Sequence, residues 1–466
     1  MGSDTAIANK TTLWKKDKDH FFHPYTNFKT FDEQGSTIYA SGRDHFIYDE
    51  TGNEYLDGIA GLWCVNIGHG NREMADLMAE QAAKLAYYNT FGGASSPPAA
   101  QLAAKLAELA PSTLNKTFFG TGGSMANDTA VKIAHYYFNI KGKPHKKKII
   151  SRDLGYHGST YLAHALTGIA STHIGFDLPI DGLVHHVTAP YEYRKPADAE
   201  HMDFCDYLLE DLEHTILELG ADTIAAFIAE PIMGAGGVIV PPKEYNRRTW
   251  ELCKKYEILY IADEVVTAFG RLGHMFASEA VFGVQPDILV LAKGISSGYV
   301  PLGATMITDE IYDVISTPKD ANPYFSHGFT YSGHALACAV GLKNIAIMER
   351  TERCEHVREH GPYFEQRLRE LEKYPIVGEV RGSHFMLGIE FVSDKATKAS
   401  FDPDQYDVTD RIFSHCKQLG AIVRPVGPIV VLSPPLTFDR KAIDRMVEIL
   451  SKAIEKVLDE LKERSV

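Results

Sequence analysis

The amino-acid sequence predicts an α/β fold, in which a large domain holds a mostly parallel, seven-stranded sheet and a smaller domain is α+β. The main observation is that three short apolar runs each end at a charged residue. Apolar runs of this length without polar alternation are typical of strands buried on both faces of a parallel sheet. The spacing between the runs leaves room for crossover helices. The runs are residues 223–229 before Glu230, residues 257–262 before Asp263 and residues 287–292 before Lys293.

The three charged residues are predicted to face one active site. Open α/β sheets bind ligands just outside the carboxyl ends of their strands, so two carboxylates and one amine that follow successive strands would meet there. The alternative is that they are ordinary strand-end charges in solvent. Glycine-rich turns at 234–237, 270–273 and 294–298 follow all three, and glycine permits close approach of a ligand. The active-site interpretation is therefore favoured.

Composition and charge disfavour several classes of function. The chain has 466 residues, enough for two domains or for one large domain with an appendage. Its formal net charge is −14 and its only short basic cluster is 146–148, so binding to nucleic acid or to an anionic membrane is disfavoured. No stretch reaches the roughly 18 apolar residues of a membrane span. The six scattered cysteines form no CxxC pair, as expected of reduced thiols in a cytoplasmic protein.

Two domains are predicted along the chain. The first 30 or so residues lack sustained periodicity and are expected to form an irregular arm. Strands are expected at 36–39 and 44–48, with a hairpin turn at 49–53 after the second. The predicted boundaries are 1–65 for the arm and part of the small domain, 66–335 for the large domain, and 336–466 for the C-terminal part of the small domain.

A phosphate-binding turn is predicted near the start of the large domain. The strand-like residues 116–119 run into the glycine-rich residues 120–124, and a helical segment starts at Ala126. Free backbone N–H groups and the positive end of the helix dipole meet at such a turn. Met125 stands where a GxGxxG motif needs its third glycine, and the Gly-Lys-Ser/Thr of a Walker motif is missing. A single phosphate group is therefore a better ligand than a nucleotide.

The remaining elements follow from composition and periodicity. Helices are expected at 72–87, from residue 97, at 334–373 and from Asp439, where an amphipathic stripe begins. The aromatic residues between the first two, at 87–93, are interpreted as core. Further strands are expected at 148–151, 303–308, 386–391, 421–424 and 429–432.

One pattern in the C-terminal part resembles a metal site. His356 and His360 match the HxxEH pattern of one class of zinc proteases. The pattern lies in a charged run that begins at Glu349 and has few apolar residues. A solvated helix face is therefore favoured, and no metal is predicted.

An amine after one strand, an acid after the preceding strand and a phosphate-binding turn together suggest pyridoxal 5′-phosphate. Lys293 would bind the cofactor covalently as a Schiff base, and Asp263 would pair with the pyridine nitrogen. A carboxylate at that position keeps the nitrogen protonated, so that the ring can draw electrons from the substrate. The turn at 120–124 would hold the phosphate.

Several segments that follow one another along nearly the whole chain carry a resemblance to a known family. On the basis of these segments, the sequence resembles the class III aminotransferases of the fold-type I pyridoxal-phosphate superfamily. Jointly the segments are highly specific, although no single one would suffice. They are Tyr55-Leu-Asp-Gly58, Gly122-Gly-Ser124 with Ala126-Asn-Asp128, Tyr156-His-Gly158, Ala229-Glu-Pro231, Ile261-Ala-Asp-Glu-Val265, Phe269-Gly-Arg-Leu-Gly273, Leu291-Ala-Lys-Gly294 and His327-Gly-Phe-Thr330.

The resemblance implies a role for each cofactor-binding residue. Lys293 and Asp263 would be catalytic, Lys293 also moving a proton between the substrate Cα and the cofactor. Tyr156 would stack on one face of the ring and Val265 would pack on the other. Thr330 would reach the phosphate of a neighbouring subunit, which implies a homodimer with shared active sites and leaves a tetramer open. The implied cofactor-binding set is Gly122, Gly123, Ser124, Tyr156, His157, Glu230, Asp263, Val265, Lys293, Phe329 and Thr330.

Within the class, residues 61–63 and Arg424-Pro425 look most like the ω-amine:pyruvate branch. Arg424 would clamp the carboxylate of pyruvate or a similar keto acid. The implied reaction is ping-pong transfer of an amino group to that keto acid from a primary amine or an ω-amino acid. Plain core packing for Trp63 and an exposed strand-end position for Arg424 are the alternatives. The implied substrate-binding residues are Tyr25, Trp63, Phe91, Tyr156 and Arg424.

Three other functions are compatible with the same residues. An ornithine-type or polyamine-type aminotransferase would differ in the amine donor. An intramolecular aminomutase would need no second substrate. A silent protein that binds pyridoxal phosphate as a sensor or scaffold is the alternative outside enzymes, and the presence of Lys293, Asp263 and Tyr156 together argues against it.

Two positions of the phosphate-binding turn depart from the family pattern. Where the family usually has Asn-Ser-Gly-Ser-Glu-Ala, residues 121–126 are Thr-Gly-Gly-Ser-Met-Ala. Gly122 therefore lacks a hydroxyl beside the phosphate, and Met125 removes a carboxylate from a helix start where negative charge is favourable. We expect both departures to affect how tightly the cofactor is retained.

Overall fold

The computed structural model describes residues 11–111, 113–178, 182–318 and 324–464. Its largest sheet has seven strands in the order β4-β10-β9-β8-β7-β5-β6. The strands from β9 to β6 run parallel, whereas β10 is antiparallel to both of its neighbours. The predicted mostly parallel sheet is therefore confirmed. Its strands are β4 (Leu114–Gly120), β5 (Lys148–Arg152), β6 (Val184–Val187), β7 (Ile224–Ala229), β8 (Leu259–Asp263), β9 (Ile288–Leu291) and β10 (Gly303–Thr308).

Helices cover both faces of this sheet, which explains why its central strands are uninterrupted apolar runs. On one face, Ile228 and Ile261 share an apolar cluster with α6. Their sequence neighbours Phe227 and Tyr260 point to the opposite face and belong to a second cluster, with side chains of the other covering helices. The covering helices are α5 (Pro97–Leu109), α6 (Gly123–Ile140), α8 (Phe204–Leu219), α9 (Tyr245–Lys255) and α12 (Ala335–Arg350).

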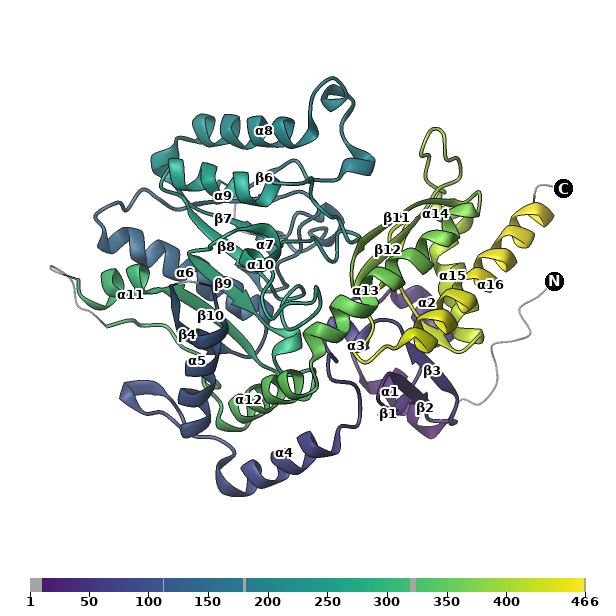
Figure 1. Cartoon of the computed structure of the whole chain (residues 1–466), viewed down its shortest axis with the longest axis horizontal. Coiled ribbons are helices and arrows are strands. Elements are labelled where there is room, and N and C mark those ends of the chain that lie inside the picture. Colours follow the sequence, from purple (N-terminus) through teal and green to yellow (C-terminus); the bar gives the residue numbers. More distant parts are fainter. Residues whose placement is uncertain (1–10, 112, 179–181, 319–323, 465–466) are drawn as a thin grey trace.

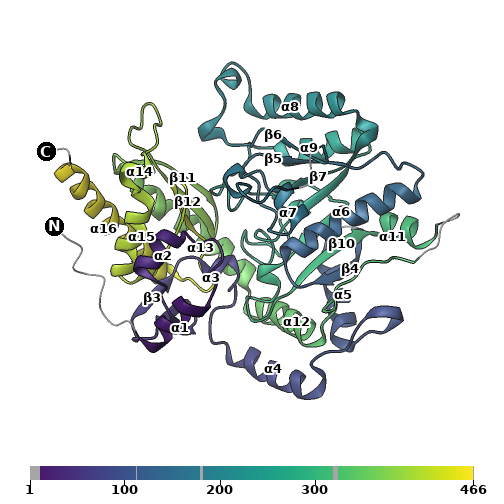
Figure 2. The same ribbon diagram turned by 180° about the vertical axis from the view of Figure 1, so that it is seen from behind.

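The remaining strands form two smaller sheets, with strand orders β1-β2-β3-β13 and β11-β12-β15-β14. Figure 1 shows them to the right of the large sheet, and Figure 2 shows the same division from behind. β13 pairs with β3, so the N-terminal and C-terminal parts of the chain share one sheet. The domain boundaries themselves remain a prediction. The strands are β1 (Tyr39–Arg43), β2 (Phe46–Asp49), β3 (Glu54–Asp57), β11 (Val377–Ser383), β12 (Met386–Phe391), β13 (Ala421–Ile422), β14 (Arg424–Val426) and β15 (Ile429–Leu432).

Some strand predictions were wrong or incomplete. The strand expected at 36–39 begins only at Tyr39, and the strand expected at 421–424 is divided between β13 and β14, which belong to different sheets. β6 and β11 were missed. The sequence of β6 has two histidines in four residues, and β11 mixes glycine, glutamate and arginine with valine, so neither has the apolar pattern of a buried strand.

Two helix predictions were also wrong. The first ten residues of the predicted arm lie outside the described residues. From Thr11 on the arm is not irregular, because Thr11 and Asn27 accept hydrogen bonds from backbone N–H groups and cap two helices. The helix expected at 334–373 is broken after α12 at Glu352, where φ is 49°. The other helices are α1 (Thr12–His20), α2 (Phe28–Gln34), α3 (Ala60–Trp63), α4 (Arg72–Leu85), α7 (Tyr161–Leu166), α10 (Ser278–Phe282), α11 (Asp309–Ser316), α13 (Arg353–Arg369), α14 (Pro403–Tyr406), α15 (Val408–Gln418) and α16 (Arg440–Arg464).

The HxxEH pattern lies on α13, where both histidines are half-buried and Arg358 and Glu359 between them are exposed, so the expected solvated face is confirmed in part. The rings of His356 and His360 stack with centroids 4.1 Å apart, and Nε2 of His356 lies 2.7 Å from the carbonyl oxygen of Phe438. Among the described residues, no group of three or more His, Cys, Asp or Glu side chains could hold a metal ion. None of the described helices is long and apolar enough to cross a membrane.

Candidate active site

Glu230, Asp263 and Lys293 lie at one edge of the large sheet. β7, β8 and β9 are parallel neighbours, so their carboxyl ends point the same way. Asp263 is the last residue of β8, Glu230 directly follows β7, and Lys293 begins a short 3-10 turn, Lys293–Ile295, after β9. The backbone of Lys293 has φ 45°, a left-handed conformation that non-glycine residues seldom adopt outside functional sites and turns.

The amine of Lys293 is prepared to act as a nucleophile. Burial lowers its pKa, while the nearby charges of Asp263 and Glu230 oppose that shift. Within the described part of the chain, the amine has no hydrogen-bond or ion-pair partner. A lowered pKa leaves a larger share of the amine unprotonated at neutral pH, and only the unprotonated amine can attack a carbonyl.

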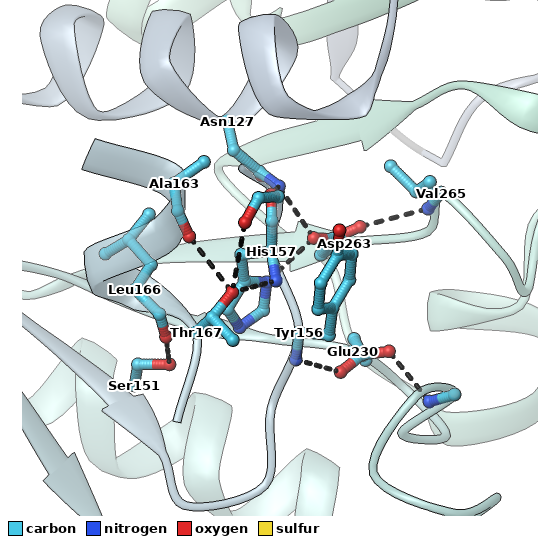
Figure 3. A network of polar contacts seen from close by, with 12 residues as sticks. Asn127, Ser151, Tyr156, His157, Ala163, Leu166, Thr167, Glu230, Asp263 and Val265 are labelled. Atoms are coloured by element: carbon cyan, nitrogen blue, oxygen red, sulfur yellow. Dashed lines mark hydrogen bonds and ion pairs between the residues drawn. The ribbon is translucent and has the colours of Figure 1, made fainter. Parts of the chain in front are cut away.

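Three groups hold the buried carboxylate of Asp263 (Figure 3). Nδ2 of Asn127 donates to Oδ2 over 2.8 Å, and Nδ1 of His157 lies 2.8 Å from the same oxygen. The backbone N–H of Val265 donates to Oδ1 over 3.1 Å. Nε2 of His157 is buried without a partner among the described residues. These bonds hold the carboxylate in one orientation.

Glu230 holds two backbone segments near the same edge. Oε1 accepts the N–H of Tyr156 over 3.0 Å, and Oε2 accepts the N–H of Gly234 over 2.8 Å (Figure 3). Burial raises the pKa of Glu230, and the charge of Asp263 adds to that rise. Nη2 of Arg152 donates to the carbonyl oxygen of Glu230 over 2.5 Å. Glu230 therefore positions Tyr156 and the turn that starts at Gly234.

Tyr156 links this group to the N-terminal arm. Its hydroxyl lies 3.1 Å from Oγ of Ser159 and 3.3 Å from the hydroxyl of Tyr25. Burial raises the pKa of Tyr156 to about 12, so its phenol stays neutral at physiological pH. Tyr25 is 71% exposed even though its hydroxyl makes this contact.

The glycine-rich turn before α6 has the form of an anion site. Gly122 is the N-cap residue and no side chain caps the helix, so its first N–H groups have no partner within the helix. A Cβ on Gly123 would lie 3.1 Å from Cγ2 of Val265, which places Val265 against the turn. Oγ of Ser124 accepts the N–H of Ser159 over 3.0 Å.

Trp63 is part of an apolar cluster beside the turn after β7, in a loop with positive φ at Ala60, Gly61 and Trp63. A Cβ on Gly234 would lie 3.3 Å from Cζ3 of Trp63 and 3.4 Å from Oε2 of Glu230. The buried Trp63 therefore packs as core and also borders Glu230.

Arg424 is half-buried on β14 rather than exposed. Burial lowers the pKa of its guanidinium, and the neighbouring Tyr156 and Tyr25 oppose that shift. Among the described residues no carboxylate forms an ion pair with Arg424. The guanidinium also contributes to the lowered pKa of Lys293, so the two groups interact across the site.

Phe91, Phe329 and Thr330 form a separate group. A Cβ on Gly328 would lie 2.8 Å from Cε1 of Phe91, and the carbonyl oxygen of Thr330 accepts the hydroxyl of Tyr87 over 2.7 Å. No hydrogen bond, ion pair or ring contact among the described residues joins this group to Lys293 or Asp263. Phe329 nevertheless lies beside the phosphate-binding turn, because a Cβ on Gly120 would be 4.0 Å from its Cδ2 and 3.6 Å from Cβ of Met125.

Sequence reasoning missed two residues that organise the site. Asn127 donates both to Asp263 and to the carbonyl oxygen of His157, the latter over 2.7 Å. Asn127 lies one helical turn after Gly123 on α6, so its spacing from the phosphate-binding turn could have placed it on the same helix face. The buried Asp57 accepts the N–H groups of Ile59 and Gly61 and thereby holds the loop that carries Trp63.

The residues present fit pyridoxal phosphate. A Cβ on Gly122 would meet no atom within 4 Å, so there is space beside the uncapped N–H groups for a phosphate. The unpaired amine of Lys293 suits an aldehyde, and the fixed carboxylate of Asp263 suits a pyridine nitrogen. Each part of the cofactor thus has a complementary group in this structure.

Comparisons with known proteins agree with this geometry. The model of the family Aminotransferase class-III matches residues 31–454. The putrescine–pyruvate aminotransferase of Pseudomonas aeruginosa is 41% identical over 455 residues, which cover 97% of this chain and 98% of that protein.

Two solved structures are similar along their whole length. An (S)-enantioselective omega-transaminase from Thermomicrobium roseum has a TM-score of 0.93 and 43% identity, over 97% of this chain and 99% of that chain. The omega transaminase of Pseudomonas jessenii in complex with PMP has a TM-score of 0.92 and 40% identity, over 96% of this chain and 99% of that one. The chain belongs to the class III aminotransferases, and it is a pyridoxal-phosphate-dependent transaminase of fold type I.

Proposed function

We propose that this aminotransferase moves an amino group from a primary amine or an ω-amino acid to pyruvate or a similar keto acid by a ping-pong mechanism. The observation that carries the proposal is Arg424, a half-buried guanidinium without a carboxylate partner among the described residues, close enough to Tyr156 and Lys293 to interact electrostatically. A free guanidinium fork matches the carboxylate of a keto acid. The relative from Pseudomonas aeruginosa, named for putrescine and pyruvate, supports the same substrate classes.

The catalytic roles follow from the geometry. When bound, the cofactor supplies an electrophilic carbon and a ring that accepts electrons. Lys293, with its lowered pKa, would take the proton from the substrate carbon and pass it to the cofactor in the first half of the reaction, and it would move a proton the opposite way in the second half. Asn127, His157 and Val265 hold the carboxylate of Asp263 in one orientation, in which it would pair with the ring nitrogen. Gly122, Gly123 and Ser124 would bind the phosphate, and Tyr156 and Val265 would face the ring.

The substrate-binding roles are divided between an apolar side and a charged side. Trp63 would offer apolar surface to the amine, Phe91 would add to that surface from the other subunit of a dimer, and Tyr25 closes the site through its contact with Tyr156. Arg424 binds the carboxylate of the acceptor. A donor without a carboxylate, such as a diamine, leaves Arg424 unoccupied, which explains how one site can serve two unlike substrates.

We also propose a homodimer with shared active sites in the cytoplasm. Large aromatic side chains are exposed around Phe91 and Thr330, and no hydrogen bond, ion pair or ring contact among the described residues joins these two residues to Lys293 or Asp263. In a dimer, Phe329 and Thr330 would complete the site of the other subunit. All six cysteines are free, which supports a reducing compartment. The exposed aromatic residues in question are Tyr88, Phe91, Tyr324 and Tyr331.

A panel of amine donors with pyruvate as the acceptor tests the proposed reaction. Diamines, ω-amino acids and arylalkylamines are compared by steady-state rate, and the bound cofactor is followed by absorbance. A primary amine alone should bleach the cofactor band, and pyruvate should restore it. Turnover without any acceptor would point to an aminomutase, and no spectral response to any amine would point to a silent binding protein.

A further inference from the structure

Arg381 and Arg424 lie in one cross-strand row of the sheet β11-β12-β15-β14. Arg381 is opposite Gly388, Gly388 is opposite Val431, and Val431 is opposite Arg424. Directly opposed residues of antiparallel strands point to the same face of a sheet. The two arginines therefore leave the same face from the two edge strands, β11 and β14.

This face covers the turn that starts at Gly234 and ends at Val238. A Cβ on Gly388 would lie 3.3 Å from both the carbonyl oxygen of Gly237 and Cβ of Val238. Val431 and Val238 belong to the same apolar cluster as Trp63. Figures 1 and 2 show β11 and β12 on the side of the smaller sheets that faces the large sheet. The cross-strand row thus rests on the turn whose first N–H is bound by Glu230.

Arg381 fastens β11 to that turn. Its Nε and Nη2 donate to the carbonyl oxygen of Gly237 over 3.0 and 2.7 Å, and its guanidinium is stacked over the ring of Tyr191 at 4.6 Å. Nη1 donates to Glu379 over 2.7 Å and to Glu390 over 2.6 Å. The side chain is only 7% exposed, so these bonds are shielded from water.

Glu390 completes the attachment from β12. It is fully buried, and its carboxylate accepts the hydroxyl of Tyr191 and Nε of Arg194, the latter over 2.7 Å. Tyr191 and Arg194 follow β6 of the large sheet, whereas Arg381 and Glu390 belong to the smaller sheet. We call Arg381, Glu390, Tyr191 and Arg194 the Arg381 clasp. The Arg381 clasp joins the large sheet to the smaller sheet at the β11 end of the cross-strand row. Arg424 lies at the β14 end of the same row.

We propose that Arg381 is a positioning residue that sets where Arg424 stands over the active site, and so determines preference for acceptors with a carboxylate. This inference rests on the proposed role of Arg424. The strands of the row are about 4.8 Å apart, so the two edges are roughly 14 Å apart in a stiff hydrogen-bonded unit. If the attachment at β11 is loosened, the sheet β11-β12-β15-β14 can tilt relative to the turn at 234–238. A displacement of about 1 Å at Arg424 is enough to weaken a bidentate contact severely.

The test compares two acceptors of similar size, pyruvate and butanal, which lacks a carboxylate. The measured quantity is the ratio of kcat/KM for pyruvate to kcat/KM for butanal in the holoenzyme. We expect Arg381→Gln to lower this ratio at least about tenfold, mainly through the KM for pyruvate. The matched control is Arg367→Gln, because Arg367 bonds to Asp444 and Glu370 within the C-terminal helices and not to the large sheet. It should leave the ratio unchanged.

Arg424→Gln and the double variant separate this inference from the proposed function. If Arg381 acts through Arg424, Arg424→Gln lowers the ratio and adding Arg381→Gln lowers it no further. A ratio that falls in Arg424→Gln but not in Arg381→Gln overturns the inference and leaves the proposed function intact. An unchanged ratio in Arg424→Gln overturns the proposed function, and the inference with it. An equal loss for both acceptors in Arg381→Gln shows a purely structural role and also overturns the inference.

A second variant decides the question if Arg381→Gln does not fold into holoenzyme. Arg381→Lys keeps a positive charge beside the buried Glu390 but cannot make the two-nitrogen contact with the carbonyl oxygen of Gly237. Its ratio should fall in the same direction by a smaller factor. A ratio equal to that of the wild type in a folded Arg381→Lys enzyme would contradict the proposal.

Discussion

Nδ1 of His157 lies 2.8 Å from Oδ2 of Asp263, and both side chains are buried. Asn127 donates to the same oxygen over the same distance, while Val265 binds the other oxygen. The carboxylate is therefore oriented by side chains and backbone of the chain itself. An acid fixed in this way can act on a ring nitrogen without reorganisation, which is the usual source of large electrostatic effects in enzymes.

Asp263→Asn should lower kcat by about 100-fold or more while leaving the fold intact. The amide has nearly the same shape but cannot keep the ring nitrogen protonated, so the electron-accepting power of the cofactor falls. Steady-state kinetics with saturating amine and pyruvate measure the loss. Asp287→Asn is the control, because Asp287 is also buried but precedes β9, at the opposite edge of the sheet. Similar activities in the two variants would disprove the role of Asp263.

Lys293→Ala should abolish turnover, by at least about 100-fold, because the variant loses both the cofactor's covalent attachment and the base that moves the proton. The absorbance of the bound cofactor should also change in the absence of substrate. Lys254→Ala serves as the control, since Lys254 only pairs with Asp287 near the surface. Retained turnover in Lys293→Ala would defeat the mechanism.

Gly122→Ser should tighten cofactor binding. Gly122 has φ 175°, which any residue adopts, and a Cβ there meets no atom within 4 Å, so serine fits without strain. Its hydroxyl adds a hydrogen bond to the phosphate worth about 1 kcal/mol, or about fivefold in Kd. Titration of the apoenzyme with pyridoxal phosphate measures the change. Ser124→Ala should shift the Kd in the opposite direction.

Met125→Glu tests the second departure in the same turn. Oγ1 of Thr121 lies 2.8 Å from Sδ of Met125, so the substitution removes this contact and places a negative charge at the helix start. We expect a changed Kd for the cofactor in the same titration. Unchanged values for both Met125→Glu and Gly122→Ser would show that the departures have no effect on retention.

Lys146 should make stability depend on pH in a defined window. Its buried Nζ donates to the carbonyl oxygens of Ala221, Ile224 and Glu257, and burial lowers its pKa to about 8. In the unfolded chain a lysine has a pKa of about 10.4. Between these values the unfolded state binds more protons, so the contribution of Lys146 to stability rises with pH and levels off above about 10.4.

As the pH rises from about 8 to 10, the Tm of the wild type should therefore rise relative to the Tm of Lys146→Met. The change corresponds to about 1–3 kcal/mol in the free energy of unfolding. Lys143→Met is the control, since Lys143 forms an exposed ion pair with Glu257. A Tm difference that stays constant over this window would show that Lys146 keeps the same charge in both states.

Much of the active site could be predicted from local patterns. Glu230, Asp263 and Lys293 end apolar runs, and strands of a parallel sheet end at a common edge. Gly122, Gly123 and Ser124 stand between a strand and a helix, where an anion site forms from the backbone alone. The roles of Tyr156, Val265 and Arg424 came from family resemblance, because an aromatic or a charged residue has many uses that sequence cannot distinguish.

The sequence by itself determined the fold class, the family and the position of Lys293 just after a strand, because burial pattern, strand length and turn chemistry are properties of neighbouring residues. Only the tertiary structure showed that Asn127 and His157 share one oxygen of Asp263 and that residues 12–20 and 28–34 form helices. Only strand register placed Arg381 in the row of Arg424. Register and side-chain contacts join residues far apart in the chain, and no local pattern specifies which distant strands will pair.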